Sequence, residues 1–170
     1  MKRLFIILTL AIVFMAACKK QFSVRTSGTD TIDNIKHLTT FVYGFSFSQA
    51  KLVETGSDIV LDLKKESATL IPTLQANNRL PSFLKVGEYA NEDEAKNAFD
   101  NLKTIPEPQQ WLDMADPIAP NQVWIYRSNN EKYTKFRIVE VKIEKIELVV
   151  DYAECTFQWI HQPDGSVNFP

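Results

Sequence analysis

The chain has 170 residues, of which 19 are Lys or Arg and 21 are Asp or Glu, so its formal net charge is −2. This length suits one domain with its own hydrophobic core. The charge balance excludes a strongly basic nucleic-acid binder, and two cysteines are too few for a disulfide framework.

The first 17 residues have the three parts of a secretory signal peptide. Lys2 and Arg3 precede an apolar run at residues 4–17 that ends in small side chains. At about 1.5 Å per residue, this run is too short to cross a hydrocarbon core of about 30 Å. We therefore expect residues 1–17 to be removed on export, which leaves 17 basic against 21 acidic residues.

The segment MAAC, residues 15–18, resembles the lipobox of bacterial lipoproteins. In that motif, small residues precede a cysteine whose sulfur receives a diacylglycerol, and cleavage leaves this cysteine as the first residue. Cys18 is therefore the predicted lipidation site, and more than one acyl chain anchors a protein stably. An ordinary signal peptide with an incidental cysteine is the alternative.

The residues after Cys18 are polar and lack a sustained apolar period, as in the stretch KKQFSVRTSGTDTIDN. A segment with little to bury is expected to stay flexible. The sequence therefore predicts a lipid anchor and flexible tether at residues 18–38 and a single β-rich domain at residues 39–170.

Alternating apolar residues predict the first strands of this domain. In TFVYGFSFS, aromatic residues occupy every second position from Phe41 to Phe47, and in SDIVLDLK the residues Ile59, Leu61 and Leu63 share a face. These two segments are expected to be neighbouring strands. Shorter apolar runs at residues 68–71 and 83–86 predict two more.

One amphipathic helix is predicted at about residues 91–103, from the segment NEDEAKNAFDNLK. Asn91 is the expected N-cap, Glu94 stands at the capping-box position, and the acids at residues 92–94 suit the positive end of the helix dipole. Four prolines then predict a long Pro-rich loop at residues 104–121. Its apolar Trp111 and Met114 indicate a loop that packs down as a lid or contacts a ligand.

The C-terminal part returns to strands. QVWIYRS has apolar residues on both faces, as a strand covered on both sides would. In KYTKFRIVEVKIE, Phe136 and Ile138 share one face while Val139 and Val141 take the other, which predicts a β-bulge or bend near Ile138. Further strands are expected at residues 146–152 and 154–162. The predicted fold class is mostly β, with antiparallel sheets.

Catalytic motifs are missing from the sequence, which contains no glycine-rich phosphate loop, CxxC, HExxH or GxSxG. His37 lies in the predicted tether, so His161 is the only histidine of the predicted domain. Asp58 and Asp62 share a strand face, where carboxylates commonly face water, and a paired-acid site is the alternative interpretation. We therefore expect that the protein is not an enzyme.

The lipobox, the FVYGFSFS and DIVLDL strands, the VWIYRSNNEKYTKFRIVEV hairpin and the terminal TFQWIHQPDGSVNF hairpin together resemble the HmuY-like lipoproteins. These are Gram-negative surface proteins whose best-known members capture haem, and the resemblance covers roughly residues 40–169. It implies an all-β domain tethered to the outer membrane that works beside a haem importer. The haem-binding members use paired histidines, or in some cases methionines, as axial ligands.

Two functional hypotheses follow. In the first, haem is the cofactor in an apolar cleft, with His161 or Met114 as an axial ligand and Trp111, Trp124 or Trp159 against the porphyrin. In the second, the scaffold is an interaction module that holds a protein or a glycan on exposed aromatics. A packed or rim role for His161 and a gap-filling role for Met114 are the structural alternatives.

The expected location is the envelope of a Gram-negative bacterium, at the outer membrane, where the N-terminal lipid would hold the protein. The expected partners are the membrane, haem and an outer-membrane transporter, with no nucleic acid.

Overall fold

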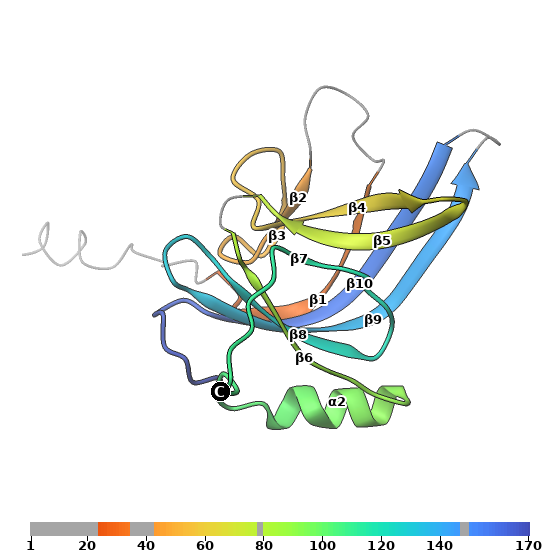
Figure 1. The fold of residues 1–170 in the computed structure, drawn as a ribbon. Helices are drawn as coiled ribbons and strands as arrows, with labels where there is room; N and C mark the ends of the chain where they lie inside the picture. The colour runs from red at the N-terminus through yellow and green to blue at the C-terminus, as the bar shows by residue number, and fades with distance from the viewer. Residues whose placement is uncertain (1–23, 35–42, 78–79, 147–149) are drawn as a thin grey trace, which may run out of the picture.

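A computed structural model describes residues 24–34, 43–77, 80–146 and 150–170 of the chain, apart from the side chains of Ile146 and Val150. Two five-stranded antiparallel sheets and one helix make up its regular structure. Figure 1 shows the sheet that contains β4 (Ile59–Glu66), which we call sheet B, and helix α2 (Glu92–Asn101) on opposite sides of the sheet that contains β9 (Tyr133–Ile146), which we call sheet A. The predicted mostly-β, antiparallel fold class with one helix is therefore confirmed.

The strands of the two sheets come from interleaved parts of the chain. Sheet A has the order β1-β10-β9-β8-β6, with β1 Ser27–Asp33, β10 Val150–Gln162, β9 Tyr133–Ile146, β8 Gln122–Arg127 and β6 Phe83–Glu88. Sheet B has the order β3-β2-β4-β5-β7, with β3 Lys51–Val53, β2 Gly44–Ser46, β4 Ile59–Glu66, β5 Thr69–Ala76 and β7 Met114–Ala115. The predicted pairing of the first two aromatic and apolar segments is confirmed, because Phe45 pairs with Ile59.

The main core lies between the two sheets, against the face of sheet A that we call the inner face. Phe47 is at its centre, with its ring centroid 5.5 Å from that of Tyr126 and 6.3 Å from that of Phe136. Trp124 and Trp159 are at most 1% exposed in the same cluster. The alternation seen in the sequence therefore places the large aromatic side chains inside the sandwich.

The opposite, outer face of sheet A is covered by helix α2, Glu92–Asn101. Asn91 caps the helix as predicted, because its side-chain oxygen accepts from the backbone N–H of Glu94 at 2.9 Å. Ala95 and Phe99 are fully buried against the sheet. The helix ends at Asn101, two residues before the end of the predicted range.

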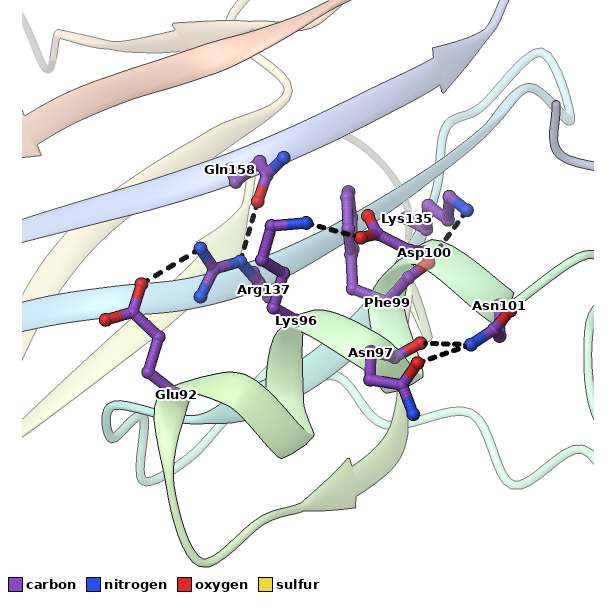
Figure 2. Close-up of polar contacts among 9 residues, drawn as sticks. All are labelled: Glu92, Lys96, Asn97, Phe99, Asp100, Asn101, Lys135, Arg137 and Gln158. Carbon is purple, nitrogen blue, oxygen red and sulfur yellow. Dashed lines mark hydrogen bonds and ion pairs between the residues drawn. The ribbon is translucent and has the colours of Figure 1, made fainter.

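Two cations of β9 attach the helix to sheet A (Figure 2). The Lys135 Nζ donates to the backbone oxygens of Phe99 and Leu102 at 2.8 and 2.9 Å. The last helical turn has no basic residue of its own, so Lys135 supplies the cation that the helix C-terminus favours. Near the other end, Arg137 Nη2 lies 3.2 Å from a carboxylate oxygen of Glu92.

The predicted β-bulge is confirmed in β9. Glu140 pairs with Thr156 and Ile138 pairs with Phe157, so Val139 is an extra residue in the ladder. The shift lets residues on both sides of the break face the core. Phe136 is fully buried, and Val141 is half-buried against the same cluster.

The prediction of a flexible tether at residues 18–38 is wrong for Ser27–Asp33. These residues form β1, which pairs with β10 from Ile160 to Glu154 at the edge of sheet A. Only Ile32 among them is fully buried. The other residues of this edge strand are polar or glycine and exposed or half-buried, so the sequence shows no apolar alternation there. Cys18 and His37 lie outside the described residues, as does the rest of residues 1–23 and 35–42.

The boundaries of the last strands also differ from the predicted ones. Ile146 ends β9 and Val150 begins β10, so the expected strand at residues 146–152 does not form one element, and residues 147–149 lie outside the described part. The Pro-rich loop at residues 104–121 is mostly irregular, as predicted. It nevertheless contains β7, which pairs with β5.

Candidate ligand-binding pocket at His161

A pocket of about 320 Å³ lies where the end of β10 and the β8–β9 turn of sheet A meet the loops around β2, β3 and β4 of sheet B. Its lining contains hydroxyl, amide, carboxyl, ammonium and imidazole groups and no aliphatic or aromatic hydrocarbon side chain. The lining residues are Ser48, Gly56, Asp58, Ser128, Asn129, Asn130, Lys132 and His161. This pocket differs in polarity from the aromatic core beside it.

His161 is the most buried of these residues. It is the penultimate residue of β10, it is 6% exposed, and its Nδ1 lies 2.8 Å from the hydroxyl oxygen of Thr134 on β9. Within the described part of the chain, its buried Nε2 has no hydrogen-bond partner. A buried polar atom without a partner is uncommon, and one beside a cavity is suited to a bound molecule.

The electrostatic surroundings of His161 keep its ring neutral. Burial, and secondarily the nearby Lys132 ammonium, lower the pKa of His161 to about 4. At pH 7 the ring therefore carries one proton. The hydrogen bond with Thr134 occupies Nδ1, so Nε2 can donate or accept according to the tautomer.

Asp58 connects the two sheets beneath the pocket. One carboxylate oxygen accepts from the Phe47 backbone N–H at 2.8 Å, and the other accepts from the Tyr126 hydroxyl at 3.3 Å. Burial raises the pKa of Asp58, while these hydrogen bonds oppose the rise. Each carboxylate oxygen therefore already accepts one hydrogen bond from the protein.

Lys132 belongs to the tight turn between β8 and β9. The Ser128 N–H donates to the Lys132 carbonyl at 2.9 Å, and the Lys132 N–H donates to the Ser128 hydroxyl oxygen at 3.1 Å. Glu131 has a positive φ of 54°, which reverses the chain there. Among the described residues, the half-buried Lys132 makes no ion pair with a carboxylate.

Only His161, of the residues predicted to bind a ligand, lines this pocket. The indoles of Trp124 and Trp159 lie in the core and donate to Gln122 at 3.1 Å and to Asp30 at 2.7 Å. Their faces are covered because the inner side of sheet A packs against sheet B. These two tryptophans therefore do not have the exposed faces that contact with a porphyrin would need.

The two predicted residues of the Pro-rich loop lie elsewhere. Trp111 is half-buried on the outer face, under the Arg127 guanidinium at 4.2 Å from the ring centroid. Met114 is in β7 on sheet B and is 37% exposed. The structure therefore does not bring Trp111 and Met114 to the His161 pocket.

Sequence reasoning missed the pocket role of Lys132 and treated Asp58 as a member of a carboxylate pair. Asp62 is exposed and accepts from the Gln75 amide at 2.7 Å, whereas Asp58 is buried between the sheets. The two carboxylates thus have separate partners. The sequence signal for a special role of Asp58 was its position directly before an apolar strand. The sequence contains no comparable signal that places Lys132 in the pocket.

In the described part of the chain, no cluster of three or more His, Cys, Asp or Glu side chains is arranged to hold a metal ion. Within the same residues, no helix combines the length and apolarity needed to cross a bilayer. Cys155 is a buried free thiol whose pKa is raised by burial. No family model matches the chain, and no curated protein matches it.

Proposed function

We propose that the protein is a lipid-anchored, non-catalytic binding protein of the Gram-negative envelope, and that it holds a small polar ligand in the His161 pocket. The observation that supports this function most directly is the buried, unpartnered Nε2 of His161, a residue that lines this pocket of mainly polar residues. A ligand that bonds to Nε2 would replace the water that the atom loses on folding.

The arrangement around His161 favours binding over catalysis. In a nucleophile–base–acid site, a carboxylate orients the histidine through its second nitrogen. Here the Thr134 hydroxyl contacts Nδ1, while Asp58 accepts from the Phe47 backbone and from Tyr126. The imidazole therefore has a fixed orientation without a carboxylate to stabilise its protonated form.

Thermal unfolding of the mature domain tests the proposed pocket. The probes are D-glucose, L-serine and L-lactate, which are neutral, zwitterionic and anionic, each compared with buffer of equal ionic strength. At least one should raise the Tm of the wild type and not that of His161→Asn, because a ligand that binds only the folded state stabilises it. If none raises the Tm, the proposed pocket function is wrong.

The anchor is tested separately in the full chain. Cys18→Ala should move the protein from the membrane fraction to the soluble or unprocessed fraction, since the thioether needs the Cys18 sulfur. Cys155→Ala is the matched control, because that thiol is buried in the core. An unchanged membrane fraction for Cys18→Ala would contradict the lipoprotein assignment.

Haem capture is the second candidate function. A neutral imidazole with a free Nε2 is what an axial iron ligand requires, and His161 has one. The polar lining of the pocket favours a smaller polar ligand, because haem sites are mostly apolar. Haemin titrated into the mature domain distinguishes the two, since capture would give a saturable, shifted Soret band that weakens in His161→Ala.

The Met114→Ala variant is the companion to that titration. Met114 does not line the His161 pocket, so this variant should bind haemin like the wild type if His161 is the axial ligand. A spectrum identical to that of haemin with an inert protein would exclude haem and leave the small-ligand proposal to the thermal assay. An outer-membrane transporter is a proposed partner only if haem binds.

A further inference from the structure

We infer that the pocket is selective for a small monocarboxylate, held by the Lys132 ammonium and the His161 imidazole. This inference rests on the proposed binding function and names the chemical class of its ligand. Three features of the pocket support it. They are the unpaired charge of Lys132, the hydrogen-bond donors that have no partner, and the carboxylate of Asp58.

The charges are the first feature. Asp58 and Lys132 are the only formally charged side chains in the lining at neutral pH. The Phe47 N–H and the Tyr126 hydroxyl already donate to the Asp58 carboxylate, whereas in the described residues no carboxylate pairs with the Lys132 ammonium. The unpaired charge in the pocket is therefore positive and suits an anion.

The remaining hydrogen-bonding groups are the second feature. If the Thr134 hydroxyl donates to Nδ1 of His161, the ring proton lies on Nε2, a buried donor that has no partner among the described residues and belongs to a residue lining the cavity. The amide groups of Asn129 and Asn130 add further N–H donors at the rim. A carboxylate offers only acceptors, so it selects this tautomer and satisfies the atom that the protein leaves unpaired.

Asp58 sets the limit on ligand charge. Its carboxylate lines the same cavity and would repel a second negative charge on a ligand. A dicarboxylate or a phosphate dianion is therefore disfavoured relative to a monoanion. The volume of about 320 Å³ also favours a molecule of a few heavy atoms over a polymer segment.

Isothermal titration of the mature domain with acetate, lactate and butyrate, each beside its own amide, tests this selectivity. At least one acid should bind, with its amide weaker by roughly tenfold or more, because the amide lacks the charge that Lys132 recognises. Malate, which carries a second carboxylate, should bind more weakly than lactate. If all three acids fail to bind, or if the amides bind equally well, the inference is overturned.

Variants locate the site. Lys132→Met should weaken the binding of the acid by roughly tenfold or more, whereas Lys132→Arg should bind within a few-fold of the wild type. Lys65→Met is the matched control, because Lys65 is an exposed lysine of β4 and its loss changes the net charge equally. A carboxylate that binds Lys132→Met as tightly as the wild type would overturn the inference.

Two replacements of His161 separate its nitrogens. Asparagine can keep the contact with Thr134 while it removes the group at Nε2, and glutamine places an amide near Nε2. Binding should be lost in His161→Asn and partly retained in His161→Gln, with circular dichroism confirming that both variants fold. The reverse order would overturn the assigned role of Nε2.

The two proposals fail in different ways. If D-glucose or L-serine stabilises the wild type through His161 while no monocarboxylate binds, the pocket function stands and the carboxylate selectivity is wrong. If none of these probes binds, both proposals are wrong.

Discussion

The two faces of sheet A bury polar side chains in different ways. On the outer face, Lys135 is fully buried and donates to the Phe99 and Leu102 carbonyls, with the Phe99 ring centroid 5.0 Å from its ammonium. At the end of the inner face, His161 is almost as buried, yet its Nε2 has no partner in the described structure. The Lys135 ammonium is therefore hydrogen-bonded by the protein, whereas the buried Nε2 of His161 is not.

This difference distinguishes a structural polar group from a candidate binding group. Lys135 replaces water with backbone carbonyls, so it holds helix α2 and has little capacity for anything else. Arg137 on the same face has an unpaired Nη1, but it does not line the His161 pocket. An unpaired polar atom therefore indicates a ligand only where a cavity of suitable chemistry lies beside it.

The inner face should give the largest stability effect. Phe47 is 1% exposed, and it makes ring contacts with Phe45, Tyr126, Phe136, Phe157 and Trp159. Phe47→Ala should lower the free energy of unfolding by about 3–5 kcal/mol through lost burial and a cavity. Urea denaturation measures this change, with the exposed Leu52→Ala as the control. A loss below about 1 kcal/mol would show that the two sheets do not share this core.

On the outer face, Lys135→Ala should lower the free energy of unfolding by about 2–4 kcal/mol, because it leaves two carbonyls without their donor. Lys96→Ala on the exposed side of α2 is the control and should cost less than about 1 kcal/mol. Equal effects from the two lysines in urea denaturation would mean that Lys135 does not anchor the helix.

The pH dependence of stability also tests the difference between the two faces. The pKa of His161 is about 4 in the folded state against an ordinary value of 6.5, so between these values the unfolded chain binds a proton that the folded chain does not. The free energy of unfolding should therefore fall as the pH drops from 6.5 to 4. His161→Asn lacks this titration. The free energy of unfolding of the wild type minus that of the variant should therefore become smaller as the pH falls from 6.5 to 4.

That pH experiment depends on the charge beside the ring as well as on burial. Lys132→Met removes the nearby ammonium and so raises the folded-state pKa of His161. The lower end of the window should therefore move to higher pH, and the total loss of stability across the window should be smaller. A difference between wild type and His161→Asn that does not vary from pH 6.5 to pH 4 would show that the imidazole is protonated equally in both states.

The smallest effect is expected at the N-terminus of α2. Asn91→Ala should lower the free energy of unfolding by about 1 kcal/mol, because the Glu94 N–H loses its acceptor. Asn91→Asp keeps an acceptor there and should stay near the wild type in urea denaturation. An equal loss in both variants would contradict the capping role.

The sequence alone determined the features that depend on neighbours along the chain. Asn91 and Glu94 identify the helix start because a cap needs only residues three apart. The change of apolar parity between Ile138 and Val139 identifies the bulge, since both sides of the break must still face the core. The apolar residues on both faces of QVWIYRS likewise predict β8 as a strand covered on both sides.

The tertiary structure decided which of these surfaces meet. β1 is polar and becomes a strand only because β10 supplies its hydrogen bonds, so local pattern could not identify it. The sequence pattern of Trp124 and Trp159 is compatible with core packing and with ligand contact. Both residues are core residues because sheet B covers them. The pocket needs His161 and Lys132 from sheet A beside Asp58 from sheet B. Such a juxtaposition depends on the packing of the sheets, which the spacing of residues in the chain does not encode locally.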